Sequence, residues 1–426
     1  MLRRKLSILG VVGFAVAVAA TAAFTSTARS AATAVSPLPS SSCGPIVYKG
    51  SGKPDVIIAS DLPLQGAQRA QTVEISRAEI WALAEVGWHV GNIDIGYQSC
   101  DDSTAQAGNY DLAKCATNGH LYANNKGVIG VLGTFNSACA KVIVPIANRA
   151  GPLAMVSPAN TNPGITKKWD PGEPQKYYPT GERNYARVVA TDDIQGPADA
   201  VYAKAIGLKK VYVLNDKTTY GEGVARTFAS ASKKLGITVA ANQGWDPKAT
   251  SYEALANNIK ASGAKGVYLG GVSDNNGAKL IQDIKSVNPK IQLFAPDGFS
   301  APSANGGKVA NGMIVSVAGE PPNKLVGAGA DFVKSFSKQI GTTPNPYAAY
   351  GAQAMQVLLA AIRKGGTDRG AVTSALFGIH ITNGIIGTFT INSSGDTDLN
   401  AITVYRQQGN NLNPVRTIVP SPDLIG

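Results

Sequence analysis

The sequence predicts an α/β protein made of two doubly wound lobes, each a parallel sheet with helices on both faces. Short apolar runs alternate with segments of helical periodicity, and this alternation occurs in two sets, 53–188 and 192–310. Continuous apolar strands separated by helices are typical of parallel sheets buried on both faces. The length of 426 residues also suits two domains better than a single core.

Residues 1–34 have the layout of a secretory signal peptide, with a basic start, an apolar run and then small residues. We therefore expect cleavage and an extracytoplasmic location, in the periplasm or cell envelope. The run is almost long enough to span a bilayer, so an uncleaved anchor is the alternative. Lipidation of Cys43 is not expected, because Ser40 stands where an aliphatic residue is required. Residues 35–52, rich in Ser, Pro and Gly, predict a flexible lead-in.

The charge of the chain argues against a nucleic acid as partner. There are 39 Lys and Arg against 28 Asp and Glu, a net charge of +11, and loss of the leader would remove four basic residues and leave +7. No basic run exceeds three residues. Phosphate recognition needs clustered charge, and an export signal directs the chain away from the genome.

Four cysteines, Cys43, Cys100, Cys115 and Cys139, lie in the first third of the chain. An even number in an exported protein indicates two disulfides, for which three pairings exist. We favour Cys43 with Cys100 and Cys115 with Cys139. A metal site is not expected, because CxxC spacing is absent and the three histidines are scattered.

The strands are predicted from buried apolar runs between turn residues. They are 56–60, 93–99, 127–133, 152–157, 210–216, 237–243, 266–271 and 292–296. Helices are predicted over 191–207, 220–236 and 277–287, where apolar residues recur at helical spacing. Asp192 or Asp193 is placed to cap the first of them.

The segment 157–164 passes abruptly from an apolar strand to polar side chains. In doubly wound sheets, ligands bind beyond the carboxyl ends of the strands, so Ser157, Asn160, Thr161 and Asn162 are candidates to face a ligand. The alternative is an ordinary turn in which two prolines fix the backbone and the polar side chains bond nearby amides. The composition of the segment does not decide between them.

Several longer motifs add a resemblance to a known family. They are "GVLGTFNSACAK", "PLAMVSPANTNPGIT", "NYARVVATDDIQGPADA", "NDKTTYGEGVARTF", "FAPDGFS" and "GIIGTFTINSSGD". In this order, and covering essentially the whole mature chain, they resemble the leucine/isoleucine/valine-binding proteins. These are the type I periplasmic substrate-binding proteins of ABC importers.

The resemblance implies two Rossmann-like lobes joined by three crossovers and closing on a ligand by a hinge. The crossovers are expected near 188–192, 313–319 and 383–388. The expected boundaries are 53–190 plus 319–384 for lobe 1, 191–318 plus 385–418 for lobe 2, and 419–426 for a tail.

The resemblance also implies a ligand site. In the first lobe, Ser137 and Thr161 with backbone amides would bind a ligand carboxylate, with Asn136 beside them and the carbonyl of Asn160 facing a ligand ammonium. A helix N-terminus offers unpaired N–H groups to an anion, which supports this independently. The alternative for Ser137 is a simple helix cap.

In the second lobe, Asp297 corresponds to the acid that pairs with the ligand ammonium, and its alternative is a turn aspartate before Gly298. Tyr220 corresponds to an aromatic residue at the cleft mouth. Asp192 corresponds to a polar cleft residue.

Two loops depart from the family pattern. Arg69 and Gln71 stand where amino-acid binders often have tyrosine and glycine, which adds Arg69 to the candidate ligand residues. Val272, Ser273 and Asp274 replace aromatic residues after "GG". These departures favour a more polar or negatively charged ligand.

The predicted function is capture of a small polar solute, a branched-chain or other amino acid or an amide, for an ABC importer. The expected partners are this small molecule and a transporter permease, the expected state is a monomer, and no cofactor is expected. A receptor that presents the ligand to a signalling partner is the alternative. An enzyme is not expected, because neither a GxSxG elbow nor a Walker loop occurs.

Overall fold

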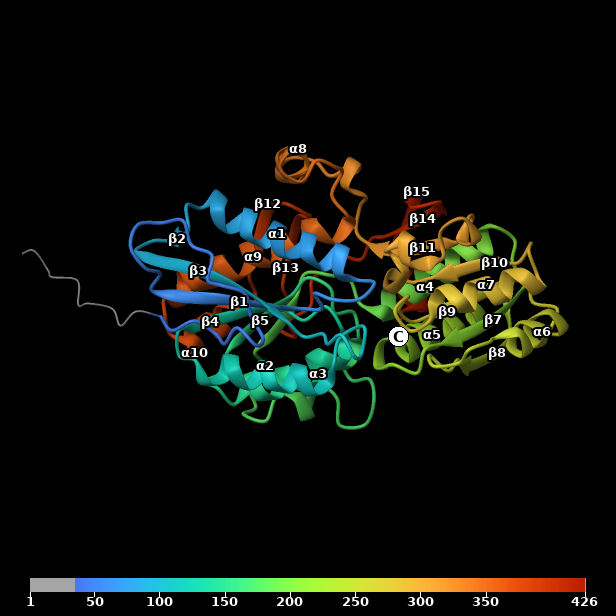
Figure 1. The fold of residues 1–426 in the computed structure, drawn as a ribbon, viewed down its shortest axis with the longest axis horizontal. Helices are drawn as coiled ribbons and strands as arrows, with labels where there is room; N and C mark the ends of the chain where they lie inside the picture. Colours follow the sequence, from blue (N-terminus) through green and yellow to red (C-terminus); the bar gives the residue numbers. More distant parts are fainter. Residues whose placement is uncertain (1–34, 426) are drawn as a thin grey trace, which may run out of the picture. The chain divides into compact units, whose positions relative to one another are not determined.

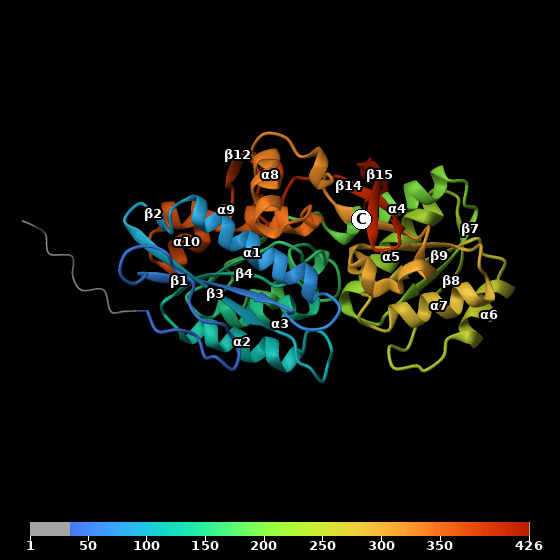
Figure 2. The same cartoon turned by 45° about the horizontal axis from the view of Figure 1, so that its top comes forward.

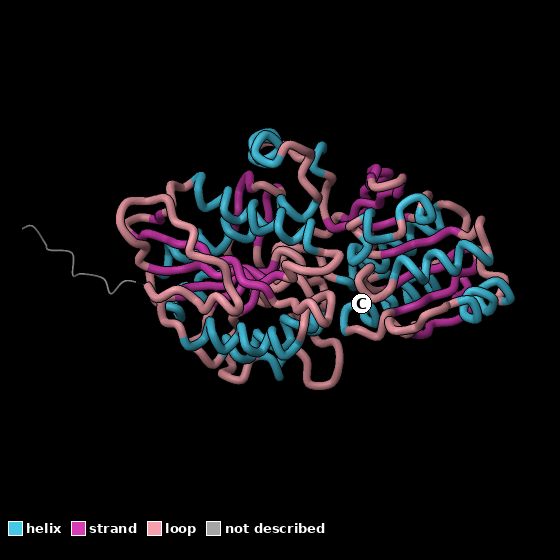
Figure 3. The backbone as a smooth tube through the Cα atoms, in the orientation of Figure 1, coloured by secondary structure: helices cyan, strands magenta, loops and turns pink. Residues whose placement is uncertain are grey.

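The computed structural model describes residues 35–425 of the chain. The predicted leader, residues 1–34, lies outside these described residues. Within them the strands form a six-stranded, a seven-stranded and a two-stranded sheet. Figure 3 shows the two larger groups of strands, each flanked by helices. The predicted α/β architecture with two doubly wound lobes is confirmed.

The first sheet has the strand order β2-β3-β1-β4-β5-β6, and all of its pairs are parallel except β2 with β3. Its strands are β1 (Val56–Leu62), β2 (His89–Val90), β3 (Ile93–Asp101), β4 (Val128–Gly133), β5 (Ala154–Ser157) and β6 (Tyr185–Arg187). Figures 1 and 2 show α1 (Arg69–Glu85) and α9 (Pro346–Gly365) on one face, and α2 (Leu112–Asn124) and α3 (Ser137–Asn148) on the other. Helix α10 (Arg369–Leu376) packs beside α9.

The second sheet has the strand order β15-β14-β11-β10-β9-β7-β8, in which only β14 and β15 run antiparallel to their neighbours. Its strands are β7 (Lys210–Asn215), β8 (Thr238–Gly244), β9 (Gly266–Gly270), β10 (Gln292–Ala295), β11 (Ile314–Ala318), β14 (Ile402–Gln408) and β15 (Asn411–Ile418). Helices α4 (Asp192–Ala205) and α5 (Thr219–Lys234) pack together on this lobe, as do α6 (Glu253–Ala261) and α7 (Gly277–Val287).

Each predicted strand coincides with an observed one to within two residues at either end. The reason is burial: every residue of β1, β4, β5 and β9 is buried, so these strands appear in the sequence as continuous apolar runs. The predicted helix caps are wrong for 191–207. Thr191 is the N-cap of α4, and neither aspartate caps it. The Asp193 carboxylate instead accepts a hydrogen bond from the Thr191 hydroxyl and pairs with Lys167 at 2.9 Å.

One of the expected crossovers needs correction. Near the second, expected at 313–319, the strand β11 still belongs to the second sheet and ends at Ala318, where the boundary of lobe 2 was expected, and the chain then continues through α8 (Ala328–Ile340). The third was expected near 383–388, so that the following residues would complete lobe 2. Instead β13 (Gly387–Thr390) pairs with β12 (His380–Gly384). Ile386 of this hairpin donates its N–H to Gln353 of α9, which keeps the hairpin with the first lobe.

The expected flexible lead-in is packed on the first sheet. Cys43 is disulfide-bonded to Cys100 of β3. Val47 exchanges backbone hydrogen bonds of 2.8 and 2.9 Å with Tyr97. The second disulfide joins Cys115 of α2 to Cys139 of α3. The favoured pairing is therefore confirmed, and both bridges lie in the first lobe.

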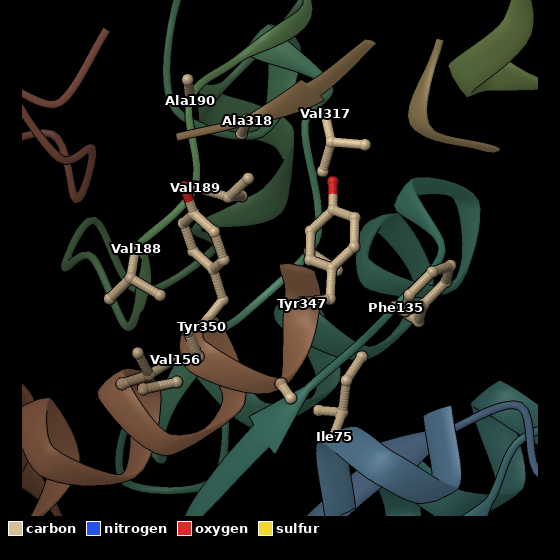
Figure 4. Packing of buried hydrophobic residues seen from close by; sticks show 14 of the residues in the cluster. Ile75, Phe135, Val156, Val188, Val189, Ala190, Val317, Ala318, Tyr347 and Tyr350 are labelled. Atoms are coloured by element: carbon tan, nitrogen blue, oxygen red, sulfur yellow. The ribbon is translucent and has the colours of Figure 1, made fainter. Parts of the chain in front are cut away.

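The buried core continues from the first lobe into the segments that lead to the second. Figure 4 shows Tyr347 and Tyr350 projecting from α9 toward Val317 and Ala318 of β11. The adjacent crossing segment contributes Val189, which is also fully buried. The start of α9 therefore lies where the two lobes meet.

Candidate ligand-binding site

A small pocket lies where the carboxyl ends of β4 and β5 face those of β9 and β10, as the sequence predicted for a ligand site in such sheets. Its empty volume is about 270 Å³, part of which is open to solvent. Its lining comes from both lobes: Phe135, Asn136, Ser137, Ala159 and Thr161 from the first, and Tyr220, Val272, Asp297 and Gly298 from the second.

The first-lobe wall is the N-terminus of α3. Asn136 is its N-cap residue, but no side chain caps the helix, so the alternative role of Ser137 as a simple cap is not realised. The Ser137 hydroxyl instead accepts the N–H of Asn162 at 3.3 Å. The Asn136 Oδ1 is buried and has no hydrogen-bond partner. An uncapped helix start with hydroxyl and amide groups beside it suits an anionic or polar ligand group.

The polar segment after β5 combines the two roles between which the sequence did not decide, a wall of the pocket and a turn held by its own side chains. Thr161 lines the pocket. Ser157 turns inward, where its hydroxyl accepts the N–H groups of Ala159 and Asn160 at 3.1 and 2.8 Å. Asn162 caps the following short helical turn by accepting the N–H of Gly164. Among the polar side chains of the segment, only that of Thr161 lines the pocket, and Ser157 and Asn162 hold the backbone.

Asn160 does not reach the pocket. Its carbonyl, expected to face a ligand ammonium, accepts a hydrogen bond from Arg187 at 2.9 Å. Arg187 is fully buried, also donates to the Asn162 carbonyl at 2.9 Å, and pairs with Asp396 at 2.8 Å. Sequence reasoning missed this arginine, because its partners are up to 209 residues away along the chain. Its buried charge fixes the loop that presents Thr161.

The second-lobe wall holds Asp297, directly after β10. Its Oδ1 accepts the Tyr220 hydroxyl at 2.6 Å, and its Oδ2 accepts the Tyr347 hydroxyl at 2.7 Å. Burial raises the pKa of Asp297 above its ordinary 3.8, and the two tyrosine hydrogen bonds oppose this rise. Tyr347 comes from α9 and was missed in the sequence. Asn345 caps α9 and Pro346 is its first residue, so the sequence signals the helix start but not the partner of this hydroxyl.

A second buried acid, Asp192, lies directly behind Thr161. Its N–H donates to the Thr161 carbonyl at 2.8 Å, but neither carboxylate oxygen makes a hydrogen bond of good geometry. Burial raises the pKa of Asp192 well above its ordinary value, the Thr161 hydroxyl opposes the rise, and Asp297 adds to it. Of these two acids, Asp297 lines the pocket and Asp192 does not.

The two loops that depart from the family pattern meet each other outside the pocket. Arg69 is exposed at the start of α1, so the structure does not bring it to the pocket. Gln71 bonds to Ser300 of the second lobe at 3.0 Å. The Asp274 carboxylate accepts the N–H of Ala67 at 2.8 Å. The departures thus create contacts between the lobes, and of the replaced residues only Val272 lines the pocket.

Metal binding has little support among residues 35–425. The one group with suitable atoms is Asp102, Cys115 and Cys139, which lie within 4.8 Å of one another. The two sulfurs form a disulfide and offer no thiolate. In the same part of the chain, no helix is long and apolar enough to cross a membrane.

Comparisons with known proteins identify the family of the chain. A model of the periplasmic binding protein family matches residues 58–410. The Leu/Ile/Val-binding protein homolog 2 of Brucella abortus is 26% identical over 372 residues, which are 85% of this chain and 93% of that protein.

Two solved structures share the fold. A leucine-binding protein of Thermotoga maritima has a TM-score of 0.75 at 23% identity, covering 86% of this chain and 99% of that one. A solute-binding protein of R. palustris in complex with benzoate has a TM-score of 0.71 at 19% identity, covering 86% and 96%. The chain therefore belongs to the periplasmic binding proteins, with the type I fold of the leucine/isoleucine/valine-binding group, whose members bind solutes and are not enzymes.

Proposed function

We propose that the chain is the extracytoplasmic substrate-binding protein of an ABC importer and captures a small aliphatic amino acid by hinged closure of its two lobes. The observation that carries the proposal is one pocket with opposite walls: hydroxyls and a helix N-terminus from one lobe, and a buried carboxylate from the other. The relative in Brucella is named for leucine, isoleucine and valine. The three chain segments that pass between the lobes would form the hinge.

The carboxylate of the amino acid would lie against the N-terminus of α3. Ser137 and Thr161 offer hydroxyls there, and both are almost completely buried. The first N–H groups of a helix have no partner within the helix, and the helix dipole favours an anion at this end. This wall therefore recognises a negative charge without an arginine or lysine.

The ammonium group would lie against Asp297, with Asp192 behind Thr161 as a second buried acid. Both carboxylates are buried, and the Asp192 oxygens have no partner of good geometry, so a cation here would offset an electrostatic cost that the protein alone leaves. The Asn136 Oδ1, also without a partner, is a further acceptor. Because this wall offers hydrogen-bond acceptors, it suits a ligand group that donates several hydrogen bonds.

The remaining side chains of the lining are apolar. Phe135, Ala159 and Val272 are buried and surround the space left between the two polar walls. An aliphatic side chain gains free energy in proportion to the apolar area it buries there, roughly 25 cal/mol per Å². The small volume disfavours long or charged side chains, so a polar or negatively charged ligand is not what we propose.

Calorimetry with a matched set of leucine analogues tests this proposal. Leucine keeps both charged groups, leucinamide lacks the carboxylate, and 4-methylpentanoate lacks the ammonium. We expect leucine to bind and each analogue to bind at least tenfold more weakly. Equal affinity for leucine and 4-methylpentanoate would contradict the role of the acids and favour a plain carboxylate, as in the benzoate complex of the R. palustris protein.

The transporter role has its own test. A permease complex reconstituted in vesicles should hydrolyse ATP faster when the liganded protein is added, and size-exclusion chromatography should show a monomer. Ligand binding without any stimulated permease would contradict the importer while leaving the pocket assignment intact.

A further inference from the structure

The amino-terminal edge of the second sheet gathers basic residues that are dispersed along the sequence. This basic edge consists of the six segments 203–211, 231–239, 259–267, 285–293, 306–314 and 405–412. Its basic residues are Lys204, Lys209, Lys210, Lys233, Lys234, Lys260, Lys265, Lys285, Lys290, Lys308 and Arg406. None of the six segments contains an aspartate or a glutamate. The sequence argument that the chain lacks clustered charge therefore does not hold in three dimensions.

Backbone hydrogen bonds show that the segments are neighbours. The Lys209 carbonyl accepts the N–H of Thr238 at 2.9 Å, and the Lys210 carbonyl accepts that of Lys265 at 3.0 Å. The Lys265 carbonyl in turn accepts the N–H of Gln292 at 3.1 Å. Adjacent strands lie about 4.8 Å apart, so these lysines form a row across the sheet.

These charges are not neutralised by the protein. Among residues 35–425, no lysine or arginine of the basic edge forms an ion pair within 4.0 Å, and most are exposed. Lys234 and Lys285 are partial exceptions, because their ammonium groups donate to the carbonyls of Asp423 and Ile291, each at 2.7 Å. Burial also lowers the pKa of Lys285. The basic edge therefore presents a strong unscreened positive potential to solvent.

Helix dipoles explain only part of this pattern. Lysines in the last turn of a helix are favoured by its negative end, which accounts for Lys204, Lys260 and their counterparts in α5 and α7. Lys209, Lys265 and Lys290 precede or begin strands, where no such dipole acts. Stabilisation of helices therefore does not account for all the lysines of the basic edge.

Two exposed aliphatic side chains lie on the same surface. Ile206 is 41% exposed and sits between Lys204 and Lys209, and Val309 is 43% exposed beside Lys308. Basic residues combined with exposed aliphatic residues are typical of proteins that lie on a membrane interface. A soluble polyanion or an acidic protein loop would use the lysines but would leave these two side chains without an apolar environment.

We propose that the basic edge docks on the surface of a bilayer that contains anionic lipids, with Ile206 and Val309 reaching the boundary between headgroups and acyl chains. The pocket lies at the carboxyl ends of the same strands, so the docked protein keeps its pocket at the opposite end of the sheet. Protein bound to the bilayer surface would reach the transporter permease by diffusion along the membrane. The lysines supply most of the attraction, which falls with ionic strength.

Co-sedimentation with vesicles tests the proposal on the compact unit 34–426, which excludes the apolar leader. Vesicles of phosphatidylcholine that contain about 30% of the anionic lipid phosphatidylglycerol are compared with vesicles of pure phosphatidylcholine. We expect binding to the anionic vesicles alone, and its loss in about 0.5 M salt, where screening is strong. A variant that carries Lys209→Gln, Lys210→Gln, Lys265→Gln and Lys290→Gln should bind the anionic vesicles roughly six-hundredfold more weakly, at about fivefold per lysine.

The matched control changes Lys126, Lys334, Lys338 and Lys364→Gln, which removes the same charge from the first lobe. It should bind vesicles almost as wild type, and both variants should keep wild-type thermal stability. Equal binding by the two quadruple variants, or wild-type binding to neutral vesicles, would overturn the proposal. The variant with Ile206→Ser and Val309→Ser should bind vesicles more weakly but keep wild-type binding to dextran sulfate. Unchanged vesicle binding would assign the surface to a soluble polyanion instead.

Discussion

At the scale of single residues, the pocket depends on Asp297 and on the groups that hold it. Its carboxylate accepts one tyrosine hydroxyl from each lobe, so the acid that would bind a ligand ammonium also connects the lobes. The sequence, with the family resemblance, predicts Ser137, Thr161, Tyr220 and Asp297, all of which line the pocket. It cannot predict Tyr347 or Arg187, because their partners are far away in the chain.

Asp297→Asn should weaken binding of the amino acid by about 2–5 kcal/mol, because the substitution keeps the size of the side chain and removes the partner of a buried cation. Calorimetry with leucine measures this loss. Asp331→Asn, an exposed site in α8, is the control and should have wild-type affinity. Unchanged affinity in the Asp297 variant would mean that the ligand has no ammonium at this position.

Tyr347→Phe should weaken binding by about 1.5–3 kcal/mol, the usual contribution of a hydrogen bond to a charged group. Removing this hydroxyl takes one donor from Asp297 and one contact between the lobes. Tyr350→Phe is a matched control on the same helix, because Tyr350 is buried but has no bond to the acid. If both variants lost affinity equally, the effect would be a packing effect of α9.

At the scale of elements, the sequence predicts best where burial is complete. The fully buried parallel strands are found to within two residues, whereas β13 was assigned to the wrong lobe. The local sequence pattern of a strand in a small hairpin does not show which lobe the hairpin joins. This is decided by contacts such as that of Ile386 with Gln353, which no local pattern reveals.

Helix α4 carries a buried acid that makes its packing pH-dependent. The Asp199 carboxylate accepts the hydroxyls of Tyr268 and Ser316 at 2.9 and 3.0 Å, and burial raises its pKa to about 8 against these hydrogen bonds. The folded state therefore keeps a proton that the unfolded chain releases near pH 4. Stability contributed by this group is present below that pH and is lost as the pH rises toward 8.

Asp199→Asn should flatten the decline of stability between about pH 4 and 8, because the amide cannot ionise. Thermal unfolding across this range, for wild type and variant, gives the comparison. Parallel curves for the two proteins would show that Asp199 ionises in the folded state at an ordinary pKa.

At the scale of the whole molecule, covalent and non-covalent links act on different parts of the fold. The two disulfides close loops of 57 and 24 residues within the first lobe. The lobes themselves are connected by hydrogen bonds such as those of Asp274 with Ala67 and Gln71 with Ser300. Stability of the first lobe and closure of the pocket should therefore respond to different perturbations.

Reduction of the disulfides should lower the free energy of unfolding by about 2–4 kcal/mol per bridge. Denaturant unfolding with and without reductant measures the effect. Titration of the unfolded, non-reduced protein should find no thiol, and four free thiols would contradict both bridges and the inferred export.

The central claim is that both lobes close on one ligand, and small-angle X-ray scattering tests it most directly. The radius of gyration of residues 34–426 should fall when saturating leucine is added, because Ser137 and Thr161 would hold one end of the ligand and Asp297 the other. The Asp297→Asn variant should show no such change at the same leucine concentration. A wild-type radius of gyration that stays constant at a leucine concentration shown by calorimetry to saturate the site would contradict ligand-driven closure.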